Sequence, residues 1–224
     1  MSTVSILLAL ALQVGPGDTV PVRRVEAVPI DPGSSLSALG EPSVRIRTGQ
    51  GDADIWLVRT RDSAYVVARI PDSTYYWGDD VVISLDVSGD RGRTPGHDDF
   101  QWYFRRALDS SVVYRGRGGR WEAPRGDPDW RLGPAREGGG WTVSAMGDAK
   151  GWSLILRLDA AWLEGASGRS PGIAFRIYDD SPGGWFAWPA PAAGRQPASI
   201  ERSPDAWAMI CHPERSEGSV RSCE

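Results

Sequence analysis

Hydrophobic and polar residues alternate in short segments along the middle of the chain. Ser43–Arg47 alternates strictly, and Ser63–Ile70 is an apolar-rich run that is closed by Pro71 and Asp72. A period of two is typical of β-strands that bury one face. The pattern predicts an extended segment at Val20–Ile30 and strands at Ser43–Arg47, Asp54–Arg59, Ser63–Ile70, Asp80–Val87, Phe100–Arg105, Ser111–Tyr114, Trp141–Met146, Trp152–Leu158 and Ile173–Tyr178.

The connections between these strands are short and are filled with Gly, Pro, Asp and Ser. Many short strands with turns between them are typical of sandwiches and barrels. The 27 Gly and 17 Pro residues also disfavour long helices. We therefore expect an all-β fold, an antiparallel β-sandwich of two sheets that is jelly-roll-like or immunoglobulin-like. At most short helical turns are expected, one of them at Asp159–Leu163 with Asp159 as its cap.

The N-terminus differs from this alternating centre. Ile6–Leu12 is a short apolar run that contains the small-x-small triplet Ala9–Ala11, and the helix-breaking Gly15–Gly17 follows it. These features predict a signal peptide over residues 1–17 and a secreted or periplasmic protein without a transmembrane span. A buried first strand and a misassigned start are the alternatives.

The sandwich is expected to occupy residues 20–200 as a single domain, because 224 residues suit one domain with tails. Ser203–Glu224 has few apolar residues and no alternation. We therefore predict that it is a disordered or non-native tail outside the core. This segment holds both cysteines, Cys211 and Cys223, which could close a small loop.

Charge and missing motifs exclude several functions. The net charge of −4 argues against a general nucleic-acid binder, which would be strongly basic. A Cys/His zinc site is not expected, since no CxxC is present and His97 and His212 lie far apart in the sequence. The chain contains no GxSxG, HExxH, P-loop or dinucleotide fingerprint. We therefore expect a protein that is not an enzyme.

Paired aspartates are the candidate metal ligands. Asp79-Asp80 and Asp98-Asp99 lie at or beside predicted turns, and Asp179-Asp180 forms a third pair. Calcium takes several oxygen ligands at once, and clustered aspartates supply them. Asp79, Asp80, Asp98 and Asp99 are therefore the predicted calcium ligands; the alternative is that they only form turns. Asp86 lies inside a predicted strand and is interpreted as facing solvent.

Tryptophan is unusually frequent, with 11 Trp against 6 Tyr and 4 Phe. Trp77, Trp185 and Trp188 lie in segments bounded by Gly or Pro, which predicts loops. An indole offers a flat apolar plane to the C–H face of a sugar ring and a polar N–H beside it. These three residues are the candidates for saccharide stacking, unless they fold back over the ends of the sandwich. The tryptophans inside predicted strands or the helical turn are expected to pack in the core or at its edge: Trp56, Trp102, Trp152 and Trp162.

Four segments resemble, in the same order, motifs of family 9 carbohydrate-binding modules and their relatives. Tyr75–Asp86 is similar to the family's W-x-x-D-x-V-E-I-x-x-D segment, and His97–Gln101 resembles its D-D-x-Q-F strand start. Trp141–Leu163 resembles the W-x-x-E-x-x-I-P hairpin, and Pro171–Ile177 resembles the G-x-x-F-x-x strand. The resemblance covers about Ser43 to Pro189, which is most of the chain.

This resemblance implies a β-sandwich, related to DOMON-type domains, that binds plant-type saccharides such as xylan or cellulose ends. Two tryptophans hold the sugar in that family, which implies Trp77 as the first and Trp185 or Trp188 as the second. Calcium supports the family's fold. Gln101 and Tyr103 are the implied neighbours of the ligand. Two departures concern the family's polar ligand contacts, because Ile83 stands in place of a Glu and Tyr103 in place of an Arg.

The sequence thus predicts non-catalytic carbohydrate binding by a module associated with glycoside hydrolysis, with a saccharide as partner and calcium as its candidate cofactor. A scaffold domain detached from a larger envelope protein is the main alternative, favoured by the two missing polar contacts. A DOMON-like haem or redox module would need axial ligands, for which Met146 and His97 are the candidates. A glycoside hydrolase would need two carboxylates across a cleft, and no such pair is evident.

Overall fold

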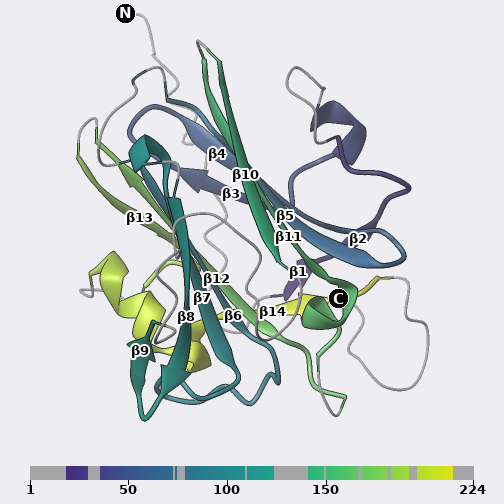
Figure 1. The fold of residues 1–224 in the computed structure, drawn as a ribbon, viewed down its shortest axis with the longest axis vertical. Helices are drawn as coiled ribbons and strands as arrows, with labels where there is room; N and C mark the ends of the chain where they lie inside the picture. Colours follow the sequence, from purple (N-terminus) through teal and green to yellow (C-terminus); the bar gives the residue numbers. More distant parts are fainter. Residues whose placement is uncertain are drawn as a thin grey trace, which may run out of the picture.

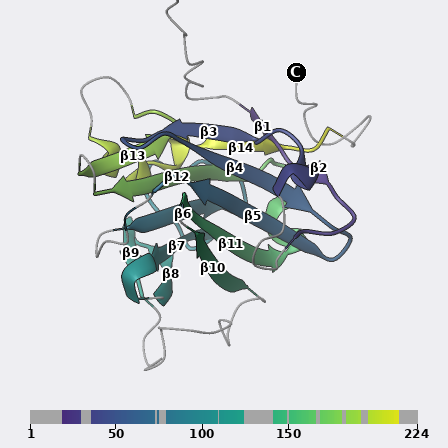
Figure 2. The same cartoon turned by 90° about the horizontal axis from the view of Figure 1, so that it is seen from above.

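The computed structural model describes residues 19–29, 36–72, 74, 79–108, 110–123, 141–148, 150–165, 168–180, 183–191 and 196–213. Within them, two β-sheets stack face to face as a β-sandwich (Figure 1 and Figure 2). The large sheet has the order β1 (Thr19–Pro21), β14 (Ala208–Cys211), β12 (Gly172–Asp179), β6 (Asp80–Asp86), β7 (Asp99–Arg105), β8 (Ser110–Arg117) and β9 (Arg120–Glu122), with β13 (Gly184–Trp188) also paired to β12.

The small sheet has the order β10 (Thr142–Asp148), β11 (Gly151–Asp159), β5 (Ser63–Ile70), β4 (Asp52–Arg59) and β2 (Arg23–Arg24), with β3 (Val44–Arg47) also paired to β4. All pairs in both sheets are antiparallel except β1 with β14 and β2 with β4, which are parallel. The predicted all-β sandwich is confirmed, with short parallel pairs added at the sheet edges.

Helical structure in the described residues is limited to short 3-10 turns, none of which is long or apolar enough to cross a membrane. Ala160–Leu163 (η3) is the helical turn that the sequence predicts. Asp159 precedes it, but its side chain makes no capping hydrogen bond, so that detail of the prediction is wrong. The other turns are η1 (Leu36–Leu39), η2 (Arg106–Leu108), η4 (Pro197–Arg202) and η5 (Pro204–Ala206).

The core lies between the sheets, and the alternation of each strand explains which side chains enter it. Ile83 of β6 pairs with Trp102 of β7 and with Phe175 of β12, and all three are buried in the main apolar cluster. Their sequence neighbours point to the outer face of the large sheet, which is the face turned away from the small sheet. Ile83 is therefore a core residue, and Val82 takes the outward position in that part of β6.

The C-terminal segment is part of the fold, which corrects the prediction of a tail beginning at Ser203. β14 pairs with β1 and β12, and Trp207 is 0% exposed. The run Trp207–Cys211 is short and lies between polar stretches, so it carries too little periodicity to predict a strand. Cys211 is disulfide-bonded. The chain's other cysteine, Cys223, lies outside the described residues, as do the predicted signal peptide and residues 214–224.

Candidate functional site

The outer face of the large sheet gathers aromatic and charged side chains at the junction of β7, β12 and β13. Trp185 of β13 is paired directly with Tyr178 of β12, and their rings meet edge to face with centroids 5.4 Å apart. Tyr103 of β7 also approaches Trp185 edge to face, at 6.4 Å between centroids. All three rings are half-buried. This arrangement leaves part of each ring open to solvent on one surface.

Trp185 and Trp188 do not act together, because they lie on opposite faces of one strand. The sequence predicts both in a loop, whereas the structure places them in β13, paired with β12. Residues three apart in a strand point to opposite sides of the sheet. Trp188 is consequently 8% exposed and packs in the core, with its ring 5.9 Å from that of Phe175. The prediction of Trp188 as a ligand-binding residue is wrong.

One face of the Trp185 indole is backed by a guanidinium group. The Cζ atom of Arg176, on β12, lies 4.3 Å from the centroid of the Trp185 ring. A cation over the face of an indole is attracted by the ring quadrupole, and the attraction grows as both groups lose water. Arg176 is 6% exposed, so its burial lowers the pKa of the guanidinium while the nearby Glu201 carboxylate raises it. The contact therefore restrains the orientation of the ring.

Tyr103 is held in place by Asp80. The Tyr103 hydroxyl donates to Asp80 Oδ2, and Arg105 Nε donates to Asp80 Oδ1 at 3.2 Å. Arg105 Nη2 also donates to the Tyr103 hydroxyl oxygen, at 3.3 Å. Burial and the neighbouring Asp80 raise the pKa of Tyr103 to about 12, and burial raises the pKa of Asp80. Tyr103 is therefore neutral at pH 7, and it presents a half-buried phenol beside Trp185.

Gln101 and Trp77 are the remaining candidates for ligand binding. Gln101 is on the same outer face, but it is buried and its Nε2 donates to Ser84 Oγ at 3.4 Å. Ala174, which pairs with Ser84, is covered by Ile200 and Trp207 of the C-terminal segment. Gln101 thus lies beneath this covering rather than at the open surface. Trp77 lies outside the described residues, so its role stays a prediction.

The predicted set of four calcium ligands is not brought together, because its two pairs lie at opposite ends of β6 and β7. In the register of these strands Asp80 is opposite Arg105, and Asp86 is opposite Asp99. Six residue steps along a strand correspond to about 20 Å. Asp80 pairs with Arg105, and Asp79 Oδ2 accepts a hydrogen bond from Arg106 Nη1 at 3.2 Å. Asp79 and Asp80 are therefore partners of arginines, and the prediction that they share a metal with Asp98 and Asp99 is wrong.

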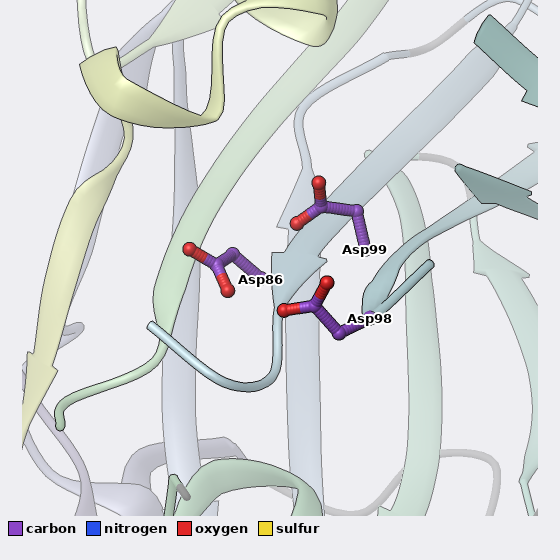
Figure 3. Close-up of side chains that lie close together, drawn as sticks. All are labelled: Asp86, Asp98 and Asp99. Carbon is purple, nitrogen blue, oxygen red and sulfur yellow. The ribbon is translucent and has the colours of Figure 1, made fainter. Parts of the chain in front are cut away.

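Asp98 and Asp99 instead converge with Asp86, at the end of β6 and the start of β7 (Figure 3). One carboxylate oxygen from each lies within 4.8 Å of the others. Asp86 is 0% exposed and accepts hydrogen bonds from the backbone N–H groups of Gly89 at 2.7 Å and Arg91 at 2.9 Å. The sequence interpretation of Asp86 as a solvent-facing residue is wrong; only the strand register reveals its carboxylate partners.

The electrostatics of this acidic cluster are unfavourable without a cation. Burial, together with the neighbouring carboxylates, raises the pKa of Asp99 to about 7, and burial also raises the pKa of Asp86. Oδ1 of Asp99 is buried and has no hydrogen-bond partner, and the buried Oδ1 of Asp98 lies 3.5 Å from Nδ1 of the exposed His97. Buried carboxylate oxygens in a loop region are the donors that a hard divalent cation such as calcium takes. The residues of this cluster therefore fit calcium.

The candidate axial ligands of a haem are not brought together. His97 is exposed in the loop before β7 of the large sheet. Met146, on β10 of the small sheet, packs against an apolar cluster that contains Trp56 and Ile155. The structure thus places His97 in an exposed loop and Met146 in an apolar cluster of the small sheet, and it does not show them as a pair of axial ligands.

These features define a β-sandwich module with an aromatic, charged surface on the outer face of one sheet and an acidic cluster at the end of that sheet. No family model and no curated protein sequence matches the chain. Among solved structures, a family 9 carbohydrate-binding module from Caldicellulosiruptor kristjanssonii in complex with glucose is similar, with a TM-score of 0.55 and 16% sequence identity. The similarity covers 90% of this chain and 98% of that one.

A structure of a family 9 module from the same organism in complex with cellotriose gives a TM-score of 0.53 and 16% identity, covering 91% of this chain and 98% of that one. The chain therefore has a family 9-like β-sandwich fold, as the resemblance implies. Both similar structures are carbohydrate-binding modules.

Proposed function

We propose that the protein is a non-catalytic carbohydrate-binding module, and that a saccharide stacks on Trp185. The observation that carries the proposal is the half-buried indole of Trp185 on the outer face of the large sheet, backed by Arg176 and flanked by two tyrosines. An apolar plane with polar groups at its margin matches a pyranose, which has C–H faces and hydroxyl edges. The glucose and cellotriose in the similar structures favour a β-glucan or a related xylan-type chain as the ligand.

Tyr103 and Arg105 are the polar groups that would orient the sugar. The phenol of Tyr103 is fixed by Asp80, and the guanidinium of Arg105 lies beside it, 5.6 Å from its ring centroid. Hydrogen bonds from fixed groups supply specificity because a ligand that lacks the matching hydroxyl leaves them unpaired. The resemblance implies a Glu and an Arg as polar contacts, whereas Ile83 and Tyr103 stand at those positions. We therefore expect a sugar preference distinct from that of the similar structures.

Replacing Trp185 with alanine is expected to weaken saccharide binding by at least about tenfold, because the stacking surface is lost. Isothermal titration of the purified protein with cellotriose and xylotriose, in calcium-containing buffer, measures the effect. Tyr65→Ala is the control, because Tyr65 is a half-buried aromatic residue that packs on the small sheet. Wild-type protein that binds neither sugar would contradict the proposed function and favour the scaffold alternative, with an envelope protein as its partner. Equal affinities for wild type and Trp185→Ala would rule out the stacking mechanism.

We further propose that Asp86, Asp98 and Asp99 hold a structural calcium ion, which would remove their mutual repulsion. After dialysis against a chelator, calcium at a hundredfold excess over its Kd is expected to stabilise the protein by about 2.7 kcal/mol, or roughly 5–10 °C in Tm. Asp99→Asn should abolish this shift, whereas Asp62→Asn, at an exposed site outside the cluster, should leave it unchanged. The calcium proposal fails if wild-type protein shows the same Tm in calcium and in chelator.

A secreted or periplasmic location remains part of the proposal. Disulfides persist in oxidising compartments, and Cys211 is disulfide-bonded. N-terminal sequencing of the mature protein from culture medium or periplasm tests both this location and cleavage near residue 17.

A further inference from the structure

The C-terminal brace, which we define as residues Pro197–Trp207, lies against the outer face of the large sheet beside β12 and β13, where Figure 1 shows it in yellow-green. Two indole N–H groups hold its backbone. Trp121 Nε1, from β9, donates to the Glu201 carbonyl at 3.0 Å, and Trp207 Nε1 donates to the Ile200 carbonyl at 2.6 Å. The rings of Trp121 and Trp207 are parallel within 2°, with centroids 6.4 Å apart. The backbone at Glu201 is therefore fixed relative to the sheet.

From this fixed position the Glu201 carboxylate forms an ion pair with Arg176 Nη2. Both side chains are largely removed from solvent, with 16% of Glu201 and 7% of Arg176 exposed. The same guanidinium lies over the Trp185 ring, with Cζ 4.3 Å from the ring centroid. The brace is thus connected to the proposed stacking residue, because Glu201 contacts Arg176 and Arg176 contacts the ring of Trp185.

We propose that Glu201 is a positioning residue for saccharide binding, which holds Arg176 against the indole of Trp185 and so fixes the ring for stacking. This inference rests on the proposed function and assigns a role in it to the brace. A buried guanidinium without its carboxylate partner is strongly disfavoured, so it must move toward solvent or recruit water. In either case the Arg176 guanidinium no longer lies against the indole of Trp185. A less restrained ring then loses more conformational entropy when a sugar binds.

A double-mutant cycle tests this role, with cellotriose titrated into wild type, Glu201→Gln, Trp185→Ala and the double variant. Glu201→Gln is expected to weaken binding about three- to tenfold in the wild-type background and to cause no further loss when Trp185 is absent. Glu122→Gln is the matched control, because Glu122 pairs with the exposed Arg117 on the neighbouring β8–β9 hairpin. Its affinity should equal that of wild type.

A second measurement separates positioning from a general loss of fold. In the sugar-free protein, the indole N–H NMR resonance of Trp185, assigned by its absence in Trp185→Ala, should shift in Glu201→Gln while thermal unfolding remains cooperative. Arg176→Lys should also weaken binding, because an ammonium group lacks the planar face that stacks on an indole. Wild-type protein that binds no sugar would overturn the proposed function itself. Wild-type binding with an unchanged affinity in Glu201→Gln, or an equal additional loss in the Trp185→Ala background, would overturn the positioning role alone.

Discussion

Replacing Arg106 with methionine is expected to lower the free energy of unfolding by about 3–5 kcal/mol. Arg106 follows β7, and its Nη1 donates to Asp72 Oδ2 at 3.3 Å, to Asp79 Oδ2 at 3.2 Å and to the Thr74 carbonyl at 3.0 Å. Its Cζ lies 5.3 Å from the ring centroid of buried Trp152. Methionine would fill part of the volume but would leave two buried carboxylates without their cation.

Urea denaturation of the two proteins measures this loss. Arg45→Met is the matched control, because Arg45 forms ion pairs with Glu41 and Asp54 but is 57% exposed. Exposed pairs contribute about 0–1 kcal/mol, so this control should be nearly neutral. Equal losses for the two variants would show that the Arg106 network contributes no more than a surface ion pair.

The network also links the end of β5 to the start of β6, so its loss should loosen both ends of the segment that contains Trp77.

Replacing Trp207 with alanine is expected to destabilise the protein by about 3–5 kcal/mol. Trp207, the last residue of the C-terminal brace, is fully buried and packs with Ala174 of the large sheet and Ile200 of the brace. Its indole N–H is also hydrogen-bonded to the Ile200 carbonyl, so truncation removes both apolar contact and a buried donor. The next strand, β14, then loses the packed residue that directly precedes it and holds the chain in position.

Arg202→Ala serves as the control for this substitution, since its side chain is in the same segment but is 78% exposed. We expect a change within about 0.5 kcal/mol for that surface residue. Thermal and urea unfolding of the full-length protein give both values. A negligible effect of Trp207→Ala would mean that the C-terminal segment is a tail after all, and it would also remove the basis for the role of Glu201.

The central strands could be predicted because their local sequence shows which side chains are apolar and face the core. Ser63–Ile70 is observed with the predicted bounds, and the strand predicted at Asp54–Arg59 is observed at Asp52–Arg59. Each such strand buries one face in the main core, so alternation is enforced at every second residue. The layered arrangement follows because each sheet must bury its apolar face against another layer of structure.

Strands β1, β13 and β14 could not be predicted, because the strands they pair with define them rather than their own pattern of residues. β1 has three residues and β14 has four, and neither shows a period of its own. β13 is flanked by Gly183 and Pro189, which indicate a loop when they are considered alone. Only its pairing with β12 makes this segment a strand and sends Trp185 and Trp188 to opposite faces.

The candidate site was predicted in part. Tyr103 and Trp185, which are both candidate ligand-binding residues from the sequence, have ring centroids 6.4 Å apart. Ile83, which stands in place of the family's glutamate in the resemblance, faces the core. Asp86 was missed as a partner of Asp98 and Asp99, since the register that joins them is set by the whole β6–β7 pair. The local sequence around Arg176 and Glu201 does not indicate a role at the site, because the residues that they contact are separated from them in the sequence.

The parallel pairing of β1 with β14 has a consequence for the order of events during synthesis. Thr19 pairs with Met209 and Pro21 pairs with Cys211, so the first strand to leave the ribosome must wait for nearly the whole chain. At ordinary translation speeds this delay is roughly 10–40 s. During this delay, Val20 and the neighbouring backbone groups of β1 lack their native pairing partner, β14. The β1–β14 edge of the sandwich is thus the last part of the described sheets to be completed.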